Sequence, residues 1–160
     1  MEASLINPFI NAALNVIQTM AFTQVTPGKP CLKSNKVTFG DVTGIIGLAS
    51  ETITGSMVLS FEEKAILTIV GRMLYSEYKE INQEVVDAVG ELTNMISGGA
   101  KGELSEKGYI FSMATPTMVL GKDVSITQLT QEPIISIPFS MEEGAFVIEA
   151  NIMKKTNKKL

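Results

Sequence analysis

Residues 82–106 have the sequence NQEVVDAVGELTNMISGGAKGELSE, and their pattern decides the fold. Apolar residues recur along this stretch at steps of three and four positions, which is the period of an α-helix with one buried face. Asn82 is of a type favoured at helix N-caps, so the sequence predicts a helix that begins there and continues to about Glu106. The residues expected on its core face are Val85, Val89, Leu92, Ile96 and Gly99. Ala88 and Met95 are expected at the margin of this face.

The opposite face of this helix carries a row of residues that we name the polar stripe: Asp87, Glu91, Asn94, Gly98 and Lys101. They follow one another at three- and four-residue steps, so their side chains are expected to emerge together into solvent. A glycine inside a helix costs about 1 kcal/mol relative to alanine. We interpret Gly98 and Gly102 as positions that let another backbone or protein approach closely. The alternative is that the helix breaks at residues 97–99.

Glu91 and Asn94, one helical turn apart, are the chemically suggestive part of the stripe. An amide donates and accepts hydrogen bonds without depending on its protonation state, so Asn94 is suited to orienting a water molecule. A partner would then supply the electrophile and its metal ion, and Glu91 would pair with a cation on that partner. The Glu-x-x-Asn spacing also occurs on helix faces that are merely solvated, and this alternative stays open on geometry alone.

The rest of the chain alternates between helix-like and strand-like patterns. Before the long helix, the sequence predicts a helix over residues 5–20, then short strands, then a second helix that begins at Ser60 or Glu62 and ends near residues 75–78. After the long helix the pattern returns to strands, and the last two form a hairpin around a short polar turn that ends in Gly144. The expected strands cover residues 36–39, 42–49, 53–61, 109–120, 134–141 and 145–153.

This order, helix then strands followed by helix then strands, predicts an α+β fold. We expect an internally duplicated unit of helix and antiparallel strands, with the long helices packed on a β-sheet. No linker rich in proline and serine divides the two halves, so residues 1–153 are expected to form one domain. Residues 154–160, with the sequence KKTNKKL, are expected to be a basic, solubilising C-terminal tail.

Composition excludes several classes of function. The 160 residues carry a net charge of −4, which argues against a nucleic-acid partner because such a partner needs a clustered basic surface. A single cysteine and no histidine exclude Ser-His-Asp and Cys-His catalysis and the usual zinc ligand sets, so no metal site is expected. No apolar run approaches the roughly 20 residues that cross a bilayer, and the N-terminus lacks a basic signal-peptide region. We therefore expect a cytoplasmic protein without a membrane partner.

A wider pattern combines Asp87, Glu91 and Asn94 with Pro116, which follows after the helix has given way to strand. This pattern resembles the consensus of the CheC/CheX/FliY family of chemotaxis phosphatases. The stretch GELTNMISGGAKGEL, at residues 90–104, is most similar to the CheX branch. In looser form the resemblance covers nearly the whole chain, because an N-terminal helix, strands, a long motif helix and terminal strands follow in the family's order.

The resemblance implies a phosphatase that hydrolyses the phospho-aspartate of a CheY-like response regulator in chemotaxis or two-component signalling. It implies that Asn94 orients the attacking water and that Glu91 contacts the active-site lysine of the regulator. The magnesium ion would belong to the regulator, and the chain would need no cofactor of its own.

The other motif positions are tied less directly to chemistry. Asp87, Gly98 and Lys101 are candidate partner-docking residues, and Pro116 is interpreted as a structural residue at a strand edge or bulge. The first helix contains asparagines but no Glu-x-x-Asn pair, so one site per chain is expected. This departure matches the CheX branch, and the resemblance therefore implies a homodimer formed through sheet edges.

Two other functions remain open at this point. The same fold could serve as a non-catalytic adaptor or motor component that binds a regulator without dephosphorylating it. The chain could also be a metabolite-binding or structural homodimer of unrelated function. Binding of a regulator without loss of phosphate would favour the adaptor, and loss of all regulator binding would favour the unrelated function.

Overall fold

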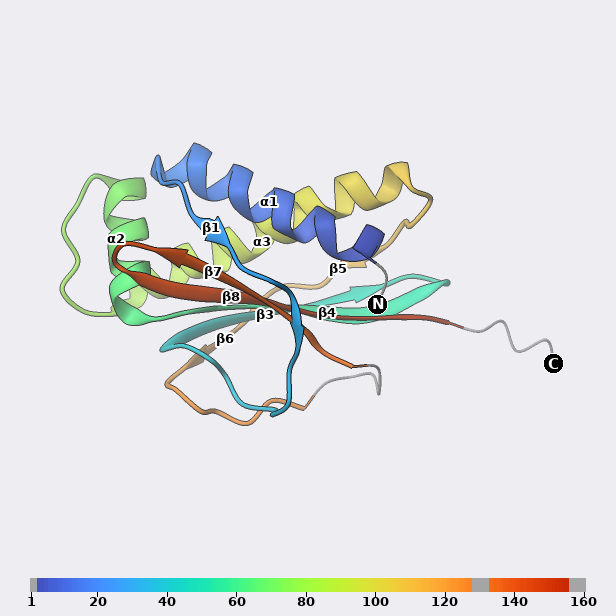
Figure 1. Cartoon of the computed structure of the whole chain (residues 1–160). Helices are drawn as coiled ribbons and strands as arrows, with labels where there is room; N and C mark the ends of the chain where they lie inside the picture. The colour runs from blue at the N-terminus through green and yellow to red at the C-terminus, as the bar shows by residue number, and fades with distance from the viewer. Residues whose placement is uncertain (1–2, 128–132, 156–160) are drawn as a thin grey trace.

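The computed structural model describes residues 3–127 and 133–155. Within these residues, eight β-strands form one antiparallel sheet, and three α-helices pack with it (Figure 1). The helices are α1 (Ala3–Ala21), α2 (Glu63–Leu74) and α3 (Gln83–Glu106). The strands are β1 (Thr26–Pro27), β2 (Cys31–Leu32), β3 (Val42–Ala49), β4 (Ile53–Phe61), β5 (Ser112–Met113), β6 (Thr117–Leu120), β7 (Ile135–Met141) and β8 (Gly144–Lys154).

The order of strands across the sheet shows that the fold is duplicated. It runs β1–β7–β8–β4–β3–β5, with β2 also pairing with β7 and β6 also pairing with β3. Each half of the chain contributes one long helix, a first strand split in two, and two further strands. The split strand of each half pairs with the middle strand of the other half, and β4 and β8 meet at the centre. The predicted α+β fold with an internal duplication is therefore confirmed.

The hydrophobic core lies between the sheet and the long helices α1 and α3, which cover the same face of it (Figure 1). Three phenylalanines on adjacent strands, Phe61, Phe139 and Phe146, are its largest side chains from the sheet. The ring centroid of Phe146 lies 4.9 Å from that of Phe61 and 4.8 Å from that of Phe139. Phe146 therefore joins the packing of three neighbouring strands beneath the helices.

Phe146→Ala is expected to lower the free energy of unfolding by about 3–5 kcal/mol, because it removes both ring contacts and leaves a cavity. Equilibrium unfolding in urea, followed by circular dichroism, measures this loss. Phe39→Ala is the matched control, since that ring is 41% exposed, and we expect a change of about 1 kcal/mol or less. An equal loss in the two variants would contradict this description of the core.

The strand predicted over residues 36–39 is wrong. Val37 forms an isolated bridge with Ser125, and the segment runs across the sheet face that lies away from the helices (Figure 1). The backbone N–H of Thr38 donates to the carbonyl oxygen of Val124 at 2.9 Å. Pairing with this distant loop therefore takes the place of the expected pairing within the sheet.

The strand predicted over residues 109–120 is interrupted. Its two pieces, β5 and β6, both pair with β3, but three residues between them face two residues of β3. The extra residue makes a β-bulge, and Pro116 is the last residue before β6 resumes the pairing. Proline has no N–H to donate, which is compatible with this position at the edge of the sheet.

Two further differences concern the ends of elements. β1 and β2 are not predicted, because strands of two residues in a Gly- and Pro-containing segment show no alternation. The predicted basic tail begins at Lys154, but this residue is still the last of β8. Lys155 follows, and its backbone N–H donates to the carbonyl oxygen of Thr52 at 2.8 Å. Residues 156–160 of that tail lie outside the described residues.

Candidate functional site

The polar stripe lies on α3, which begins where the sequence predicts. The side chain of Asn82 accepts a hydrogen bond from the backbone N–H of Val85 at 3.0 Å and so caps the first turn. The helix then continues to Glu106, so the alternative of a break at residues 97–99 is wrong. A continuous helix keeps the whole polar stripe on one rigid element.

The inward face of α3 agrees with the prediction except at Gly99. The fully buried residues on this face include Val85, Val89, Leu92 and Ile96. Gly99 is exposed instead, and it lies where α3 meets α1, because a Cβ atom there would be 3.1 Å from the Cβ of Ala12. A Cβ atom on Gly98 would meet its nearest neighbour only at 3.9 Å, and one on Gly102 would meet nothing within 4 Å. Within the chain, the close approach is therefore made at Gly99 and not at Gly98 or Gly102, and approach of a partner protein at those two glycines stays a prediction.

The polar stripe is open to solvent at its centre. Asp87, Glu91 and Asn94 are exposed, and Gly98 and Lys101 are half-buried. Asp87 Oδ1 accepts a hydrogen bond from the side-chain amide of Gln83 at 2.8 Å. The side chains of Glu91 and Asn94 make no hydrogen bond or ion pair with any described residue. Their polar atoms are therefore available to water or to a partner molecule.

Behind Glu91 and Asn94, α3 is fixed against β3 by Thr93. This threonine is fully buried, and its hydroxyl donates to the carbonyl oxygen of Val89 at 2.7 Å. A Cβ atom on Gly44 of β3 would lie only 2.2 Å from Thr93 Oγ1. Helix and strand are thus as close as the absence of a side chain at Gly44 permits. The backbone that carries Glu91 and Asn94 cannot move further toward the sheet.

Two methionines from β5 and β6 border α3 beside the stripe. If Gly90 carried a Cβ atom, that atom would lie 3.7 Å from Met118 Sδ. A Cβ atom on Gly98 would likewise lie 3.9 Å from Met113 Cε. Both side chains are half-buried, and such flexible thioethers adapt readily to a contacting surface. Sequence reasoning did not find this border, although it allowed an edge or bulge at Pro116, because the methionines are placed by the long-range pairing of β5 and β6 with β3.

The duplication gives α1 a surface equivalent to the polar stripe. α1 and α3 pack antiparallel and meet where Ala12 faces Gly99. α1 contains three asparagines, Asn7, Asn11 and Asn15. The residues three positions before them are Ser4, Pro8 and Ala12, and none of these is glutamate. The two long helices therefore carry the Glu-x-x-Asn pair once, on α3.

The first turn of α3 is anchored by a tyrosine from the preceding segment. The hydroxyl of Tyr78 donates a hydrogen bond to the carboxylate of Glu84. This hydrogen bond, with smaller contributions from desolvation and from the charge of Glu84, raises the pKa of Tyr78. Tyr78 therefore stays protonated at neutral pH and serves to hold the start of the helix.

The surface around Glu91 and Asn94 is a projecting helix face. Neither of these two side chains lines any of five well-formed cavities found among the described residues. Within the same ranges, no three His, Cys, Asp or Glu side chains are placed to hold a metal ion together. The described helices also include none with the length and apolar character to span a bilayer. Such a projecting surface suits docking into the cleft of a macromolecule that brings its own electrophile.

Comparison with known families gives a match over most of the sheet and the whole of α3. The sequence profile of the family described as chemotaxis phosphatase CheX matches residues 42–140. The CheY-P phosphatase CheX of Thermotoga maritima is 28% identical over 142 residues, which are 88% of this chain and 90% of that protein.

Comparison with solved structures agrees with this match. A CheC-like superfamily protein from Shewanella sp. PV-4 is 45% identical, with a TM-score of 0.89, over 96% of this chain and 99% of the other. A chain of the CheX–CheY–BeF3–Mg²⁺ complex from Borrelia burgdorferi is 28% identical, with a TM-score of 0.77, over 95% and 98% of the two chains.

Proposed function

Because the chain belongs to the CheX family of chemotaxis phosphatases, we propose that it hydrolyses the phospho-aspartate of a CheY-like response regulator. The observation that carries this proposal is the pair Glu91 and Asn94, exposed on one helix face and without a partner among the described residues. The CheY-P phosphatase of Thermotoga maritima and the CheX–CheY complex of Borrelia burgdorferi support a regulator of this class as the substrate.

Asn94 orients the attacking water in this proposal. Its side-chain amide holds the water by hydrogen bonds, in line with the bond between phosphorus and the aspartate oxygen. The water adds to phosphorus and that bond breaks, which leaves a free aspartate carboxylate on the regulator and releases inorganic phosphate. Because an amide does not titrate near neutrality, the contribution of Asn94 needs no particular protonation state.

Glu91 sets the docking register. It lies one helical turn before Asn94 on the same face, so a cation that binds Glu91 fixes where Asn94 enters the regulator's site. A lysine in that site is the matching group, and the resulting ion pair is a charge-assisted hydrogen bond. Asp87, Gly98 and Lys101 extend the contact along the helix as docking residues, with Met113 and Met118 as an adaptable border.

Glu91→Ala is expected to weaken binding to the activated regulator by about 10- to 100-fold, because it removes a charge-assisted contact. Isothermal titration calorimetry with a BeF3-activated, Mg²⁺-bound regulator measures the affinity. Glu106→Ala, an exposed glutamate at the end of the same helix, is the matched control and should bind like the wild type. Wild-type affinity in Glu91→Ala would exclude this residue from docking.

Magnesium enters with the regulator and not with this chain. The complex from Borrelia burgdorferi contains CheY, Mg²⁺ and BeF3, the last being a chemical stand-in for a phosphoryl group, and this supports a metal site on the partner. The described part of the chain offers no group of three side chains for a metal, which is compatible with the proposal. The ion would neutralise charge on the phosphoryl oxygens while Asn94 acts on the water.

Two chains are proposed to form a homodimer through a sheet edge. The sheet ends at β1 and β2 on one side and at β5 and β6 on the other. Edge strands offer backbone N–H and C=O groups to a further strand, so either edge supports such pairing. Pairing through β1 and β2 leaves the polar stripe accessible, because the strands that border the stripe, β5 and β6, lie at the other edge of the sheet.

The proposal is tested by following phosphate on a CheY-like regulator that has been labelled at its aspartate in the presence of Mg²⁺. Faster loss of label with a catalytic amount of the chain is the expected result. If the chain bound several BeF3-activated regulators but did not speed the loss of their phosphate label, its function would be that of an adaptor or motor component and not of a phosphatase. Absence of both binding and loss would favour an unrelated function.

A further inference from the structure

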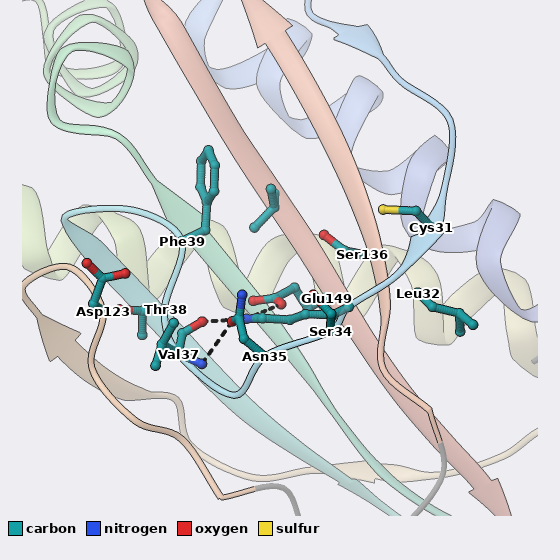
Figure 2. Close-up of a pocket in the computed structure, with 12 residues that line it drawn as sticks. Cys31, Leu32, Ser34, Asn35, Val37, Thr38, Phe39, Asp123, Ser136 and Glu149 are labelled. Carbon is teal, nitrogen blue, oxygen red and sulfur yellow. Dashed lines mark hydrogen bonds and ion pairs between the residues drawn. The ribbon is translucent and has the colours of Figure 1, made fainter.

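A second candidate site lies on the other face of the sheet. Along β8, Phe146, Ile148 and Ala150 belong to the core beneath the helices, so the alternating residues Val147 and Glu149 point to the opposite face. The connection between β2 and β3 crosses this face and borders an open pocket of about 350 Å³ over β7 and β8, which we call the cavity (Figure 2). Figure 1 shows the sheet between α3, which carries the polar stripe, and the β2–β3 connection, which contributes much of the cavity's lining.

Glu149 is a buried carboxylate in the wall of this cavity, with only 3% of its side chain exposed. One carboxylate oxygen, Oε2, forms an ion pair with Lys33, which also donates to the carbonyl oxygen of Val37 at 2.5 Å. The other oxygen, Oε1, is buried and has no hydrogen-bond partner among the described residues. A buried acceptor of this kind costs about 1–3 kcal/mol when it stays unsatisfied, so the site calls for a donor.

The charges and hydroxyls around Glu149 indicate the charge of the molecule that would carry this donor. Asp123 adds a second carboxylate at one end of the cavity, and Lys33, which is paired with Glu149, is the cation among the lining residues. Ser34 and Ser136 also line the cavity, and neither hydroxyl has a hydrogen-bond partner among the described residues. An excess of acceptors and negative charge in this pocket favours a cation and disfavours an anion.

The size of the cavity selects a small molecule over a single ion. A water molecule occupies about 30 Å³, and small-molecule pockets begin near about 300 Å³, so the cavity has room for more than one water. Apolar side chains such as Val147 and Phe39 share the lining, which suits the carbon skeleton of an organic ligand. A metal ion is a poorer fit, since no three metal-binding side chains converge anywhere in the described residues.

We propose that this cavity binds a small organic cation whose N–H group donates a hydrogen bond to Oε1 of Glu149. The alkyl part of the ligand contacts the apolar wall, and the serine hydroxyls are available to further donors or acceptors on it. The site is independent of the phosphatase reaction, because the sheet lies between the two surfaces.

The test is a titration of the uniformly ¹⁵N-labelled full chain, followed by two-dimensional NMR, with ethylammonium and ethylguanidinium chloride as probes. Saturable shifts of backbone amides in residues 31–38 and 147–149 are the expected result. Tetramethylammonium is the matched control probe, because it has the same charge but no N–H group, and it should bind at least about tenfold more weakly. Equal binding of tetramethylammonium, or no saturable shift with any probe, would overturn the proposal. An ordered water molecule, and not a ligand, would then be the donor to Oε1 of Glu149.

Two further measurements assign the binding to Glu149. Glu149→Gln should weaken binding of the ethylammonium probe at least about tenfold. Glu142→Gln, which changes an exposed acid, should leave that affinity unchanged. Should Glu149→Gln fail to fold, the pH dependence of the wild type still tests the site. Desolvation raises the pKa of Glu149, against the opposing effect of Lys33, so probe affinity should rise as the pH passes upward through that raised pKa.

The pH profile also has an outcome that contradicts the proposal. The other ionisable groups that line the cavity are Cys31 and Lys33, from the segment at β2, and Asp123, from the loop after β6. Binding that requires ionised Glu149 levels off once this acid is deprotonated. Affinity that stays constant across the whole range would show that the probe does not contact this carboxylate.

Discussion

Asn94→Ala is expected to reduce phosphatase activity to the background rate of the regulator, a loss of about 10²- to 10³-fold. A methyl group neither donates nor accepts a hydrogen bond, so the attacking water loses the group that orients it. The fold should persist, because Asn94 is exposed and alanine is the best helix-forming residue. The measurement is the single-turnover rate of phosphate loss from a regulator labelled at its aspartate.

A separate binding measurement distinguishes catalysis from docking at Asn94. The alanine variant should bind the BeF3-activated regulator nearly as tightly as the wild type, because Glu91 and the rest of the polar stripe are unchanged. Glu106→Ala, on the same helix, should match the wild type in both rate and affinity. A wild-type rate in Asn94→Ala would refute the water-orienting role, and a joint loss of rate and affinity would make Asn94 a docking residue.

The long helix and its two faces could be predicted because their signals are local. Asn82 as N-cap and the buried face from Val85 to Ile96 follow from spacing within one segment, and the structure agrees with both. Gly99 was placed on the wrong face because its role depends on α1. Only the contact with Ala12, far away in the sequence, shows that this glycine permits two helices to pack closely.

The outer face of the sheet could not be predicted for a similar reason. β1 and β2 are too short to show a period, and the segment at residues 36–39 has a strand-like composition but pairs with a loop. Glu149 had one local signal, since it is the single acid in an apolar stretch from Phe146 to Ile152. Whether such an acid is solvated or buried depends on Lys33, which the fold brings from the other half of the chain.

Gly44→Ala is expected to lower the free energy of unfolding by about 1–3 kcal/mol and to lower phosphatase activity as well. The added Cβ atom would lie 2.2 Å from Thr93 Oγ1, a side chain that is buried and hydrogen-bonded and so has little freedom to move. α3 must shift outward, and a displacement of about 1 Å at a catalytic group can cost about 10²-fold in rate. Urea unfolding and the phosphate-loss assay measure the two effects, and a variant with wild-type values in both would disprove the close contact.

The cause of the Gly44→Ala defect can be identified by relieving it. Thr93→Ala removes the atom that lies 2.2 Å from the new Cβ and leaves only the Thr93 Cβ position, at 3.2 Å. The double variant should therefore be more stable than the sum of the two single losses predicts, with a coupling of about 1 kcal/mol. Gly47→Ala, in the same strand, is the matched control, because its nearest neighbour would lie at 3.8 Å. Strict additivity would mean that Gly44 acts through the strand itself, and that Glu91 and Asn94 are not held in place by this contact.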